Sequence, residues 1–286
     1  MRRLYYPLMK MVFRFATATT GRREYLHDEI QRLGNHDTVA DPDSLKNMLD
    51  GLIARRKSAL SKYVDLRNKR GLEVGPLHAP TVSKSESDIS YMDYKTREEQ
   101  IQRCNETKVY FPYIPETDIL CPDGDFTKVL TKKYDYVIAN HVIEHIPDFI
   151  GWFKKWETFI NDDGVFFLEI PDKRYTFDKD RRETTVFHIL ADYYHQSTNV
   201  NFEEFLEKEF HFGSGPDMFS KFTDLIQAFE CKGYVDMHYH VFNHETFMKN
   251  IFQPILDTGL LSYSVLEYSH VKDHIGFYLI LKKVTS

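Results

Sequence analysis

The stretch YDYVIANHVIEHIPD, residues 134–148, sets the type of fold that the rest of the chain must complete. Its first half is β-branched and aromatic, as in a buried strand over residues 134–140. Pro147 and Asp148 follow shortly and are typical of the first turn of a helix, which we expect over residues 149–160. A buried strand that leads directly into a helix indicates a parallel sheet with both faces covered.

The same stretch contains His141, Glu144 and His145 in the spacing H-x-x-E-H. In one class of zinc peptidase, this spacing places two imidazoles beside a carboxylate base on one face of a helix. Such a helix has to continue past the second histidine, but Pro147 would remove a backbone hydrogen bond and clash with the preceding turn. A zinc peptidase is therefore a remote alternative, and we expect the three side chains in a loop at the end of a strand.

Strands and helices alternate on both sides of this stretch. Further strands are predicted over residues 71–76, 88–94, 108–119, 164–171, 260–269 and 276–284, of which the last two form a closing pair. Helical spacing of apolar residues separates several of them. This alternation predicts an α/β protein built on a mostly parallel sheet.

Two parts of the chain fall outside the alternation. Residues 1–66 form a mainly helical extension, in which Asp43 or Ser44 is the expected N-cap of one helix. We expect the main domain to occupy residues 67–286. It contains an insertion of about residues 174–245, which is rich in aromatic residues and histidine and far longer than one crossover needs. An insertion at the end of a sheet strand is well placed to cover a ligand.

The composition excludes several kinds of protein. With 286 residues, 42% hydrophobic content and 15% aromatic content, the chain can bury a large core. A formal net charge of −6 argues against a broad nucleic-acid interface. The three widely separated cysteines indicate no disulfide framework. Residues 1–21 are basic and apolar, but Pro7, Lys10 and Arg14 interrupt them, so we expect no membrane span and a cytoplasmic location.

The stretch LEVGPLHAP, residues 72–80, adds a candidate ligand site. Glu73 ends the predicted strand, and Gly75 allows a ligand to approach the backbone closely. Asp93 lies 20 residues after Glu73, at the tip of the next strand, where a carboxylate can accept hydrogen bonds from a ribose. A single glycine followed by Pro76 does not form the G-x-G-x-x-G turn that a dinucleotide pyrophosphate needs, which argues against a nicotinamide dehydrogenase.

These stretches, taken in order, resemble the class I S-adenosylmethionine-dependent methyltransferases. The resemblance rests on LEVGPLHAP, YMD, ETDIL, YDYVIANHVIEHIPD and DDGVFFLEIPDKRYTFD, and it covers roughly residues 68–180. It is closest to a subgroup associated with glycosyltransferases of bacterial surface-polysaccharide synthesis. The resemblance implies a Rossmann-like, mostly parallel seven-stranded sheet with an antiparallel closing strand. It also implies S-adenosylmethionine as cofactor, S-adenosylhomocysteine as its product, and a small-molecule or glycan acceptor.

The resemblance also assigns roles to residues along the strand ends. By this resemblance, Glu73, Gly75 and Pro76 line the methionine end of the cofactor, and Asp93 holds the ribose. Asp118 and Ile119 meet the adenine. Asn140 and His141 close over the cofactor. Asp118 is expected directly after the third strand, with its carboxylate facing the exocyclic amine of adenine. The structural alternatives are that Asp118 is only a turn residue and that Asp93 only ends its strand.

Methyl transfer to a hydroxyl gains from a general base, most often a histidine. His145 is the first candidate because it lies at the end of the fourth predicted strand, and its alternative role is to brace the loop. In DMHYH, an extended backbone would put Asp236, His238 and His240 on one face, where they could bind a metal or orient a base. Arg174 could grip a phosphate or carboxylate of the acceptor.

The predicted reaction is in-line methyl transfer to a sugar or sugar-phosphate hydroxyl. A phosphate-like group or another small metabolite is the alternative acceptor, and a non-catalytic nucleoside-binding domain is a remote alternative. Related ubiquinone-biosynthesis O-methyltransferases carry Glu-x-x-Glu-His on this loop, whereas this chain has His141 in place of the first glutamate. Because magnesium prefers oxygen ligands, we expect no obligatory metal. The sequence leaves the oligomeric state and the role of residues 1–60 open.

Overall fold

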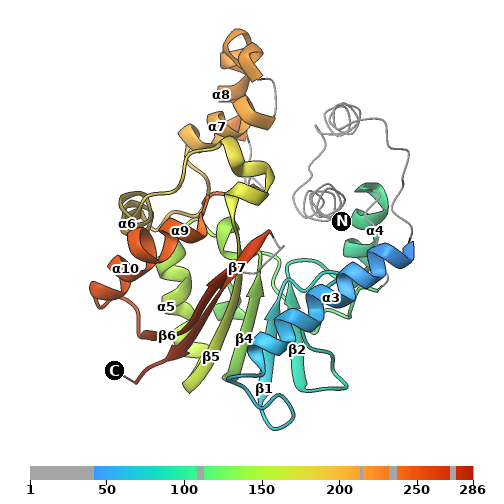
Figure 1. Cartoon of the computed structure of the whole chain (residues 1–286). Helices are drawn as coiled ribbons and strands as arrows, with labels where there is room; N and C mark the ends of the chain where they lie inside the picture. Colours follow the sequence, from blue (N-terminus) through green and yellow to red (C-terminus); the bar gives the residue numbers. More distant parts are fainter. Residues whose placement is uncertain (1–41, 108–112, 213–214, 232–236, 271–274, 286) are drawn as a thin grey trace.

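The computed structural model describes residues 42–107, 113–212, 215–231, 237–270 and 275–285 (Figure 1). Its centre is a seven-stranded sheet in the order β3-β2-β1-β4-β5-β7-β6. The strands are β1 (Arg70–Val74), β2 (Asp88–Asp93), β3 (Ile119–Leu120), β4 (Tyr134–Asn140), β5 (Ile160–Pro171), β6 (Tyr263–His270) and β7 (Gly276–Lys283). The pairs among β1 to β5 are parallel, and β7 runs antiparallel to both β5 and β6. The predicted Rossmann-like fold class is confirmed.

The order of the strands reverses between β1 and β4. Val74 of β1 lies opposite Met92 of β2 on one side and opposite Ala139 of β4 on the other. The connections that leave β1 and β4 therefore start side by side and diverge. In open parallel sheets, ligands bind at this switch point, beyond the carboxyl ends of the strands.

Side chains of the central strands alternate between two buried faces, as a sheet covered on both sides requires. Tyr136 and Ile138 of β4 pack on the face covered by α3 (Pro42–Leu60). Val137 and Ala139 pack on the opposite face, in the cluster that includes the aromatic residues of α5 (Phe149–Phe159). The sheet core is therefore apolar on both sides, and its polar groups gather at the strand ends.

The remaining helices are α4 (Arg97–Thr107), α6 (Val186–His195), α7 (Phe202–Phe212), α8 (Phe222–Cys231), α9 (His244–Phe247) and α10 (Gln253–Asp257). The elements α6 to α8 belong to the long insertion between β5 and β6. Figure 1 shows α7 and α8 projecting well beyond the sheet. None of the helices within the described ranges combines the length and the apolar character needed to cross a bilayer.

Three local predictions are corrected by the structure. The helix α3 begins at Pro42, so Asp43 and Ser44 lie in its first turn, where proline is favoured at the start. The third strand contains only Ile119–Leu120, and residues 108–112 of the predicted strand lie outside the described residues. Asp148 is the N-cap of α5 rather than a residue of its first turn, because its side chain accepts a 2.8 Å hydrogen bond from the Gly151 amide. The basic, apolar segment at residues 1–21 also lies outside the described residues.

Candidate functional site

The turn after β1 approaches the end of β2 closely. The amide of Gly75 donates a 2.8 Å hydrogen bond to the carbonyl of Met92, the residue before Asp93. Gly75 has a φ of 60°, a left-handed conformation that glycine adopts without strain, and Leu77 in the same turn has a φ of 44°. A Cβ on Gly75 would meet only Val142 Cγ2, at 3.9 Å, so the space beside this backbone is open.

Glu73 points into the protein and braces this turn. Its two carboxylate oxygens each accept a 2.9 Å hydrogen bond from the Thr81 amide, and the Thr81 hydroxyl donates another at 2.8 Å. Asn140, at the end of β4, donates to the Thr81 hydroxyl at 2.9 Å and to Glu73 at 3.3 Å. Burial raises the pKa of Glu73 to about 7, although these hydrogen bonds act in the opposite direction. Glu73 therefore joins the turn after β1 to the end of β4.

Asp93 ends β2 as a nearly buried carboxylate. Its Oδ1 accepts a 2.8 Å hydrogen bond from Gln100 Nε2 of α4 and a 3.2 Å hydrogen bond from the Lys95 amide. Burial raises the pKa of Asp93, although the hydrogen bonds from Lys95 and Gln100 lower it in part. The carboxylate is therefore held in one orientation at the strand tip, next to the Gly75 turn.

Asp118 lies before β3, not after it as the sequence suggested, because the strand begins at Ile119. Its carboxylate accepts a 2.9 Å hydrogen bond from the Tyr91 amide and forms an ion pair with Lys84. These contacts attach Asp118 to β2. Ile119 pairs with Met92, and its neighbour Leu120 pairs with Asp93 at the same edge of the sheet.

The loop after β4 has the strand-to-loop geometry that Pro147 predicted. His141 leaves the strand with a φ of 55°, and residues Ile143–His145 form a single 3₁₀ turn. The His141 ring lies between two buried carboxylates: Nδ1 is 3.6 Å from Glu144 Oε1, and Nε2 is 3.5 Å from Glu169 Oε1. Non-glycine residues with positive φ cost about 1–3 kcal/mol and cluster at functional sites. His141 and Leu77 flank the switch point on its two sides.

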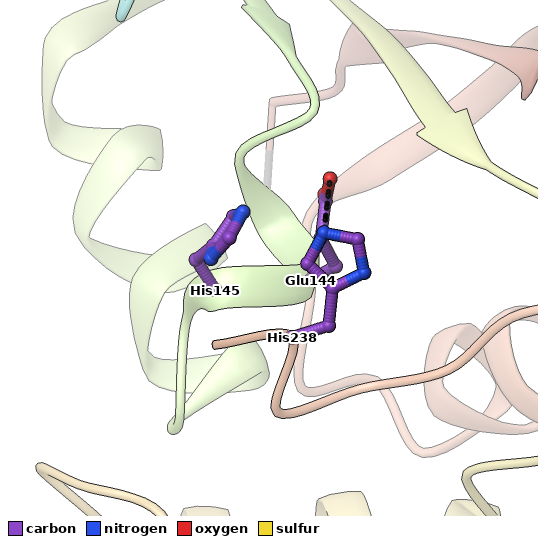
Figure 2. Close-up of side chains that lie close together, drawn as sticks. All are labelled: Glu144, His145 and His238. Atoms are coloured by element: carbon purple, nitrogen blue, oxygen red, sulfur yellow. Dashed lines mark ion pairs between the residues drawn. The ribbon is translucent and has the colours of Figure 1, made fainter. Parts of the chain in front are cut away.

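Glu144, His145 and His238 converge next to this loop (Figure 2). His145 Nδ1 lies 2.9 Å from the carbonyl of Met237, and His238 Nδ1 lies 2.6 Å from Asp178 Oδ2. A carbonyl or carboxylate oxygen only accepts, so each Nδ1 carries the proton. In the neutral rings, Nε2 then carries the lone pair. His238 Nε2 is 3.9 Å from Glu144 Oε1, and the two rings meet edge to face with centroids 4.7 Å apart.

These contacts belong to a longer arrangement that we call the buried charge row. It consists of seven largely buried groups in which cationic or basic side chains alternate with carboxylates. In spatial order they are Arg56, Glu169, His141, Glu144, His238, Asp178 and Arg181. The row starts on α3, passes the ends of β5 and β4, and ends in the insertion. Alternation of sign is what permits so many ionisable groups to be buried together.

The row also shifts its own pKa values. Burial alone would raise the pKa of Glu144, but His141, His145 and His238 outweigh it and lower the pKa. Burial would lower the pKa of His238, but the Asp178 carboxylate outweighs it and raises the pKa. The pKa of Asp178 falls to about 2 because His238 and Arg181 outweigh its burial. Glu144 and Asp178 are therefore ionised at neutral pH.

The other predicted residues lie in separate places. His238 and His240 do not share a face, because the described part of their segment, from Met237, is not a strand. His240 lies instead in a second cluster with His188 and Asp192, and Asp236 is outside the described residues. Arg174 pairs with Asp172 at 2.7 Å and with Glu245, so its guanidinium is held by two carboxylates. Pro76 follows Gly75 in the turn after β1.

Comparison with known protein families shows the family to which the chain belongs. A family model described as a methyltransferase domain matches residues 22–202, more than half of the chain. The chain belongs to this methyltransferase family. The match confirms the expected enzyme class, an S-adenosylmethionine-dependent methyltransferase.

Solved structures similar to this methyltransferase share little sequence with it. One is magnesium protoporphyrin IX methyltransferase from Synechocystis PCC 6803 with bound S-adenosylhomocysteine, at 12% identity and a TM-score of 0.40, covering 92% of this chain and 96% of that one. Another is the N-methyltransferase NodS from Bradyrhizobium japonicum WM9, at 10% identity and a TM-score of 0.39, covering 84% of this chain and 98% of that one. No curated protein matches the sequence.

The strand ends offer what a methyl-donor nucleoside requires. Asn140 Oδ1 is buried and accepts no hydrogen bond from the described residues, so it has capacity for a donor group. The open side of Gly75 and the oriented carboxylate of Asp93 lie at the same switch point. The residues present therefore fit S-adenosylmethionine.

Sequence reasoning missed several buried partners. Glu169 was visible as a charge inside the apolar run FFLEIP, which is a signal for a buried, paired carboxylate. Arg56, its partner on α3, gave no such signal, because it lies in an ordinary amphipathic helix 113 residues away. Thr81 and Asp178 were likewise unmarked in sequence, since their roles come from contacts across the fold.

Proposed function

We propose that this methyltransferase transfers the methyl group of S-adenosylmethionine to a hydroxyl of a sugar or sugar phosphate. The observation that carries the proposal is the fixed tautomer of His145, whose Nδ1 lies 2.9 Å from the Met237 carbonyl. With that proton in place, Nε2 of the neutral ring is the atom that can accept a proton. His145 is also only partly buried, unlike Glu144 and His238 beside it, so it is the accessible member of the cluster.

The cofactor would be held at the switch point. Gly75 would give it close access to the backbone, and Asp93 would accept hydrogen bonds from the ribose hydroxyls. Asn140 and His141 would close the site from β4. Glu73 and Thr81 act behind these groups, since their hydrogen bonds to each other fix the turn after β1. Pro76, Asp118 and Ile119 remain proposed contacts of the methionine end and the adenine.

The cofactor, when bound, supplies an electrophilic methyl group. The protein has to orient the acceptor oxygen and remove its proton. His145 Nε2 would take that proton, and the resulting imidazolium would lie beside the ionised Glu144 carboxylate. Glu144 is fully buried and accepts no side-chain hydrogen bond in the described structure, so a positive charge on His145 would give it a stronger partner. Asp178 keeps His238 oriented behind Glu144.

Support for a carbohydrate acceptor comes from the insertion. Phe187 and Tyr194 on α6 are 79% and 80% exposed, and Phe219, in the turn before α8, is 70% exposed. Aromatic faces pack well on the apolar C–H faces of sugars, and these exposed rings offer such faces to an acceptor. The subgroup resemblance points to the same class of acceptor, as an intermediate of surface-polysaccharide synthesis.

The cofactor site is tested by calorimetric binding of S-adenosylmethionine and S-adenosylhomocysteine. We expect the wild type to bind both, and Asp93→Asn to weaken binding by at least tenfold because the ribose loses an ionised acceptor. Asp123→Asn, an exposed aspartate after β3, is the control and should bind normally. Equal affinity for wild type and Asp93→Asn would refute the ribose role.

The general base is tested by measuring methyl transfer to a set of hydroxylated acceptors, namely sugars, sugar phosphates and small phenols. The amount of S-adenosylhomocysteine released reports the rate. His145→Gln should lower kcat by about 10²–10⁴-fold while leaving cofactor affinity intact. His195→Gln, at the exposed end of α6, is the control. Turnover restricted to phosphate-like or nitrogen acceptors would reject the sugar assignment, and full activity of His145→Gln would reject the base.

A further inference from the structure

A second group of imidazoles and carboxylates lies in the insertion. His188 and Asp192 are on the same face of α6, Glu204 is in the first turn of α7, and His240 comes from the segment before α9. One ligand atom from each of His188, Asp192 and His240 lies within 4.8 Å of the others. Two segments therefore meet at one point, which is distinct from the cluster around Glu144, and Glu204 of α7 adjoins it at 2.8 Å from His188 Nε2.

The contacts of His188 do not form a normal hydrogen-bonded pair. Its Nε2 lies 2.9 Å from Asp192 Oδ2 and 2.8 Å from Glu204 Oε1. Neither oxygen lies along the direction of an Nε2–H bond, so the nitrogen makes no hydrogen bond within the described structure. Two carboxylate oxygens that flank an imidazole nitrogen off its axis resemble ligands of one ion more than acceptors of one proton.

His240 supplies an independent observation. It is 1% exposed, and its Nε2 lies 3.2 Å from the Pro147 carbonyl, which can only accept a hydrogen bond, so Nε2 carries the proton. The lone pair of the neutral ring is then on Nδ1. That atom is buried and has no hydrogen-bond partner among the described residues. A carbonyl that holds one ring nitrogen while the other stays free is the usual arrangement of a histidine metal ligand.

We propose that His188, Asp192 and His240 bind a divalent transition-metal ion, with zinc as the best fit, as a structural site of the insertion. Zinc favours four tetrahedral ligands, and Glu204, whose Oε1 lies 2.8 Å from His188 Nε2, is the neighbouring carboxylate that would complete the set. Magnesium prefers an all-oxygen octahedron and fits this set poorly. The ion would fasten α6, α7 and the segment at His240 to one another and, through Pro147, to the loop that carries His145.

The test is zinc titration of the full chain after chelator treatment, with bound metal measured by elemental analysis. We expect wild type and His195→Gln, a matched histidine on the same helix, to bind one more tightly held zinc than His188→Gln or His240→Gln. Zinc should raise the melting temperature of wild type and leave that of His188→Gln unchanged. Circular dichroism of the metal-free variants shows whether they fold, and Asp192→Asn replaces any variant that does not. Absence of zinc binding by wild type, or equal zinc content in all variants, would overturn the proposal.

Discussion

Gly75 shows how one residue can serve both the backbone and a ligand. An alanine there would keep the φ of 60° only at a cost of about 1–2 kcal/mol, while its Cβ would occupy the open side of the turn. We expect Gly75→Ala to lower the free energy of unfolding by that amount and to weaken S-adenosylmethionine binding by more than tenfold. Gly259→Ala, at a φ of 72° with open space around it, should show the same loss of stability in denaturant titrations and no loss of binding. Equal binding losses would mean that backbone strain alone is responsible.

Glu73 should make stability depend on pH in an unusual direction. Its carboxyl pKa is about 7 in the folded protein, compared with an ordinary value of 4.5 for glutamate, so the folded state holds the proton more tightly. The free energy of unfolding should therefore fall, by up to about 3 kcal/mol from this group, as pH rises from 4.5 to 7. Glu73→Gln should remove that part of the slope in urea titrations at several pH values.

The control for this slope is Glu86→Gln. Glu86 is a surface carboxylate whose pKa is lowered to about 2, mainly by its hydrogen bond from Lys57. Its contribution to the pH dependence of the free energy of unfolding therefore lies below pH 4.5. The pH slope between 4.5 and 7 should stay unchanged in that variant. A wild-type slope that Glu73→Gln does not alter would show that Glu73 is ionised in the folded protein.

Among the elements, α3 is tied to the sheet by a buried ion pair. Arg56 reaches Glu169 of β5, and both side chains are almost completely buried. Removing one partner leaves an unpaired buried charge, so Arg56→Met should cost about 3–5 kcal/mol in chemical unfolding. Lys57→Met, which breaks an exposed pair with Glu86, should cost less than about 1 kcal/mol. The double variant Arg56→Met/Glu169→Gln should recover much of the loss; no recovery would contradict the ion-pair explanation.

The elements were predictable where local chemistry decides them. The run YDYVIAN is β4 without a residue of difference, and Pro147 correctly excluded a continuous helix across His141 and His145. Prediction failed where a tertiary contact decides. The third strand is short because its residues pair with only the last two of β2, and DMHYH is irregular where the structure describes it, because Tyr239 and His240 bond to the backbone of Glu144.

At the scale of the whole molecule, the alternation of strands and helices was enough for the fold class. It placed Gly75, Asp93 and Asn140 at one edge, since parallel strands end together. The alternation gave no information on which side chains from different elements contact one another at that edge. The buried charge row combines residues separated by more than a hundred positions, and such pairs leave no periodic trace in a single sequence.

The insertion and the sheet should differ in local stability. The central strands are buried on both faces, whereas α6 to α8 carry many exposed side chains. In hydrogen–deuterium exchange, we expect amides of β1, β4 and β5 to exchange last and those of α7 and α8 first. Cofactor alone should slow exchange in the turns after β1 and β4. Uniform protection of the sheet and insertion would show that they open as one unit.

The buried charge row also constrains how the sequence can diverge. Each member between Arg56 and Arg181 has a neighbour of opposite charge on both sides, so a neutral replacement at one position leaves the next carboxylate or imidazole with an unbalanced charge. Viable relatives should therefore exchange these positions in adjacent pairs, for example Arg56 together with Glu169, or Asp178 together with His238. An alignment of relatives should therefore show correlated substitutions between α3 and β5, which the buried charge row connects.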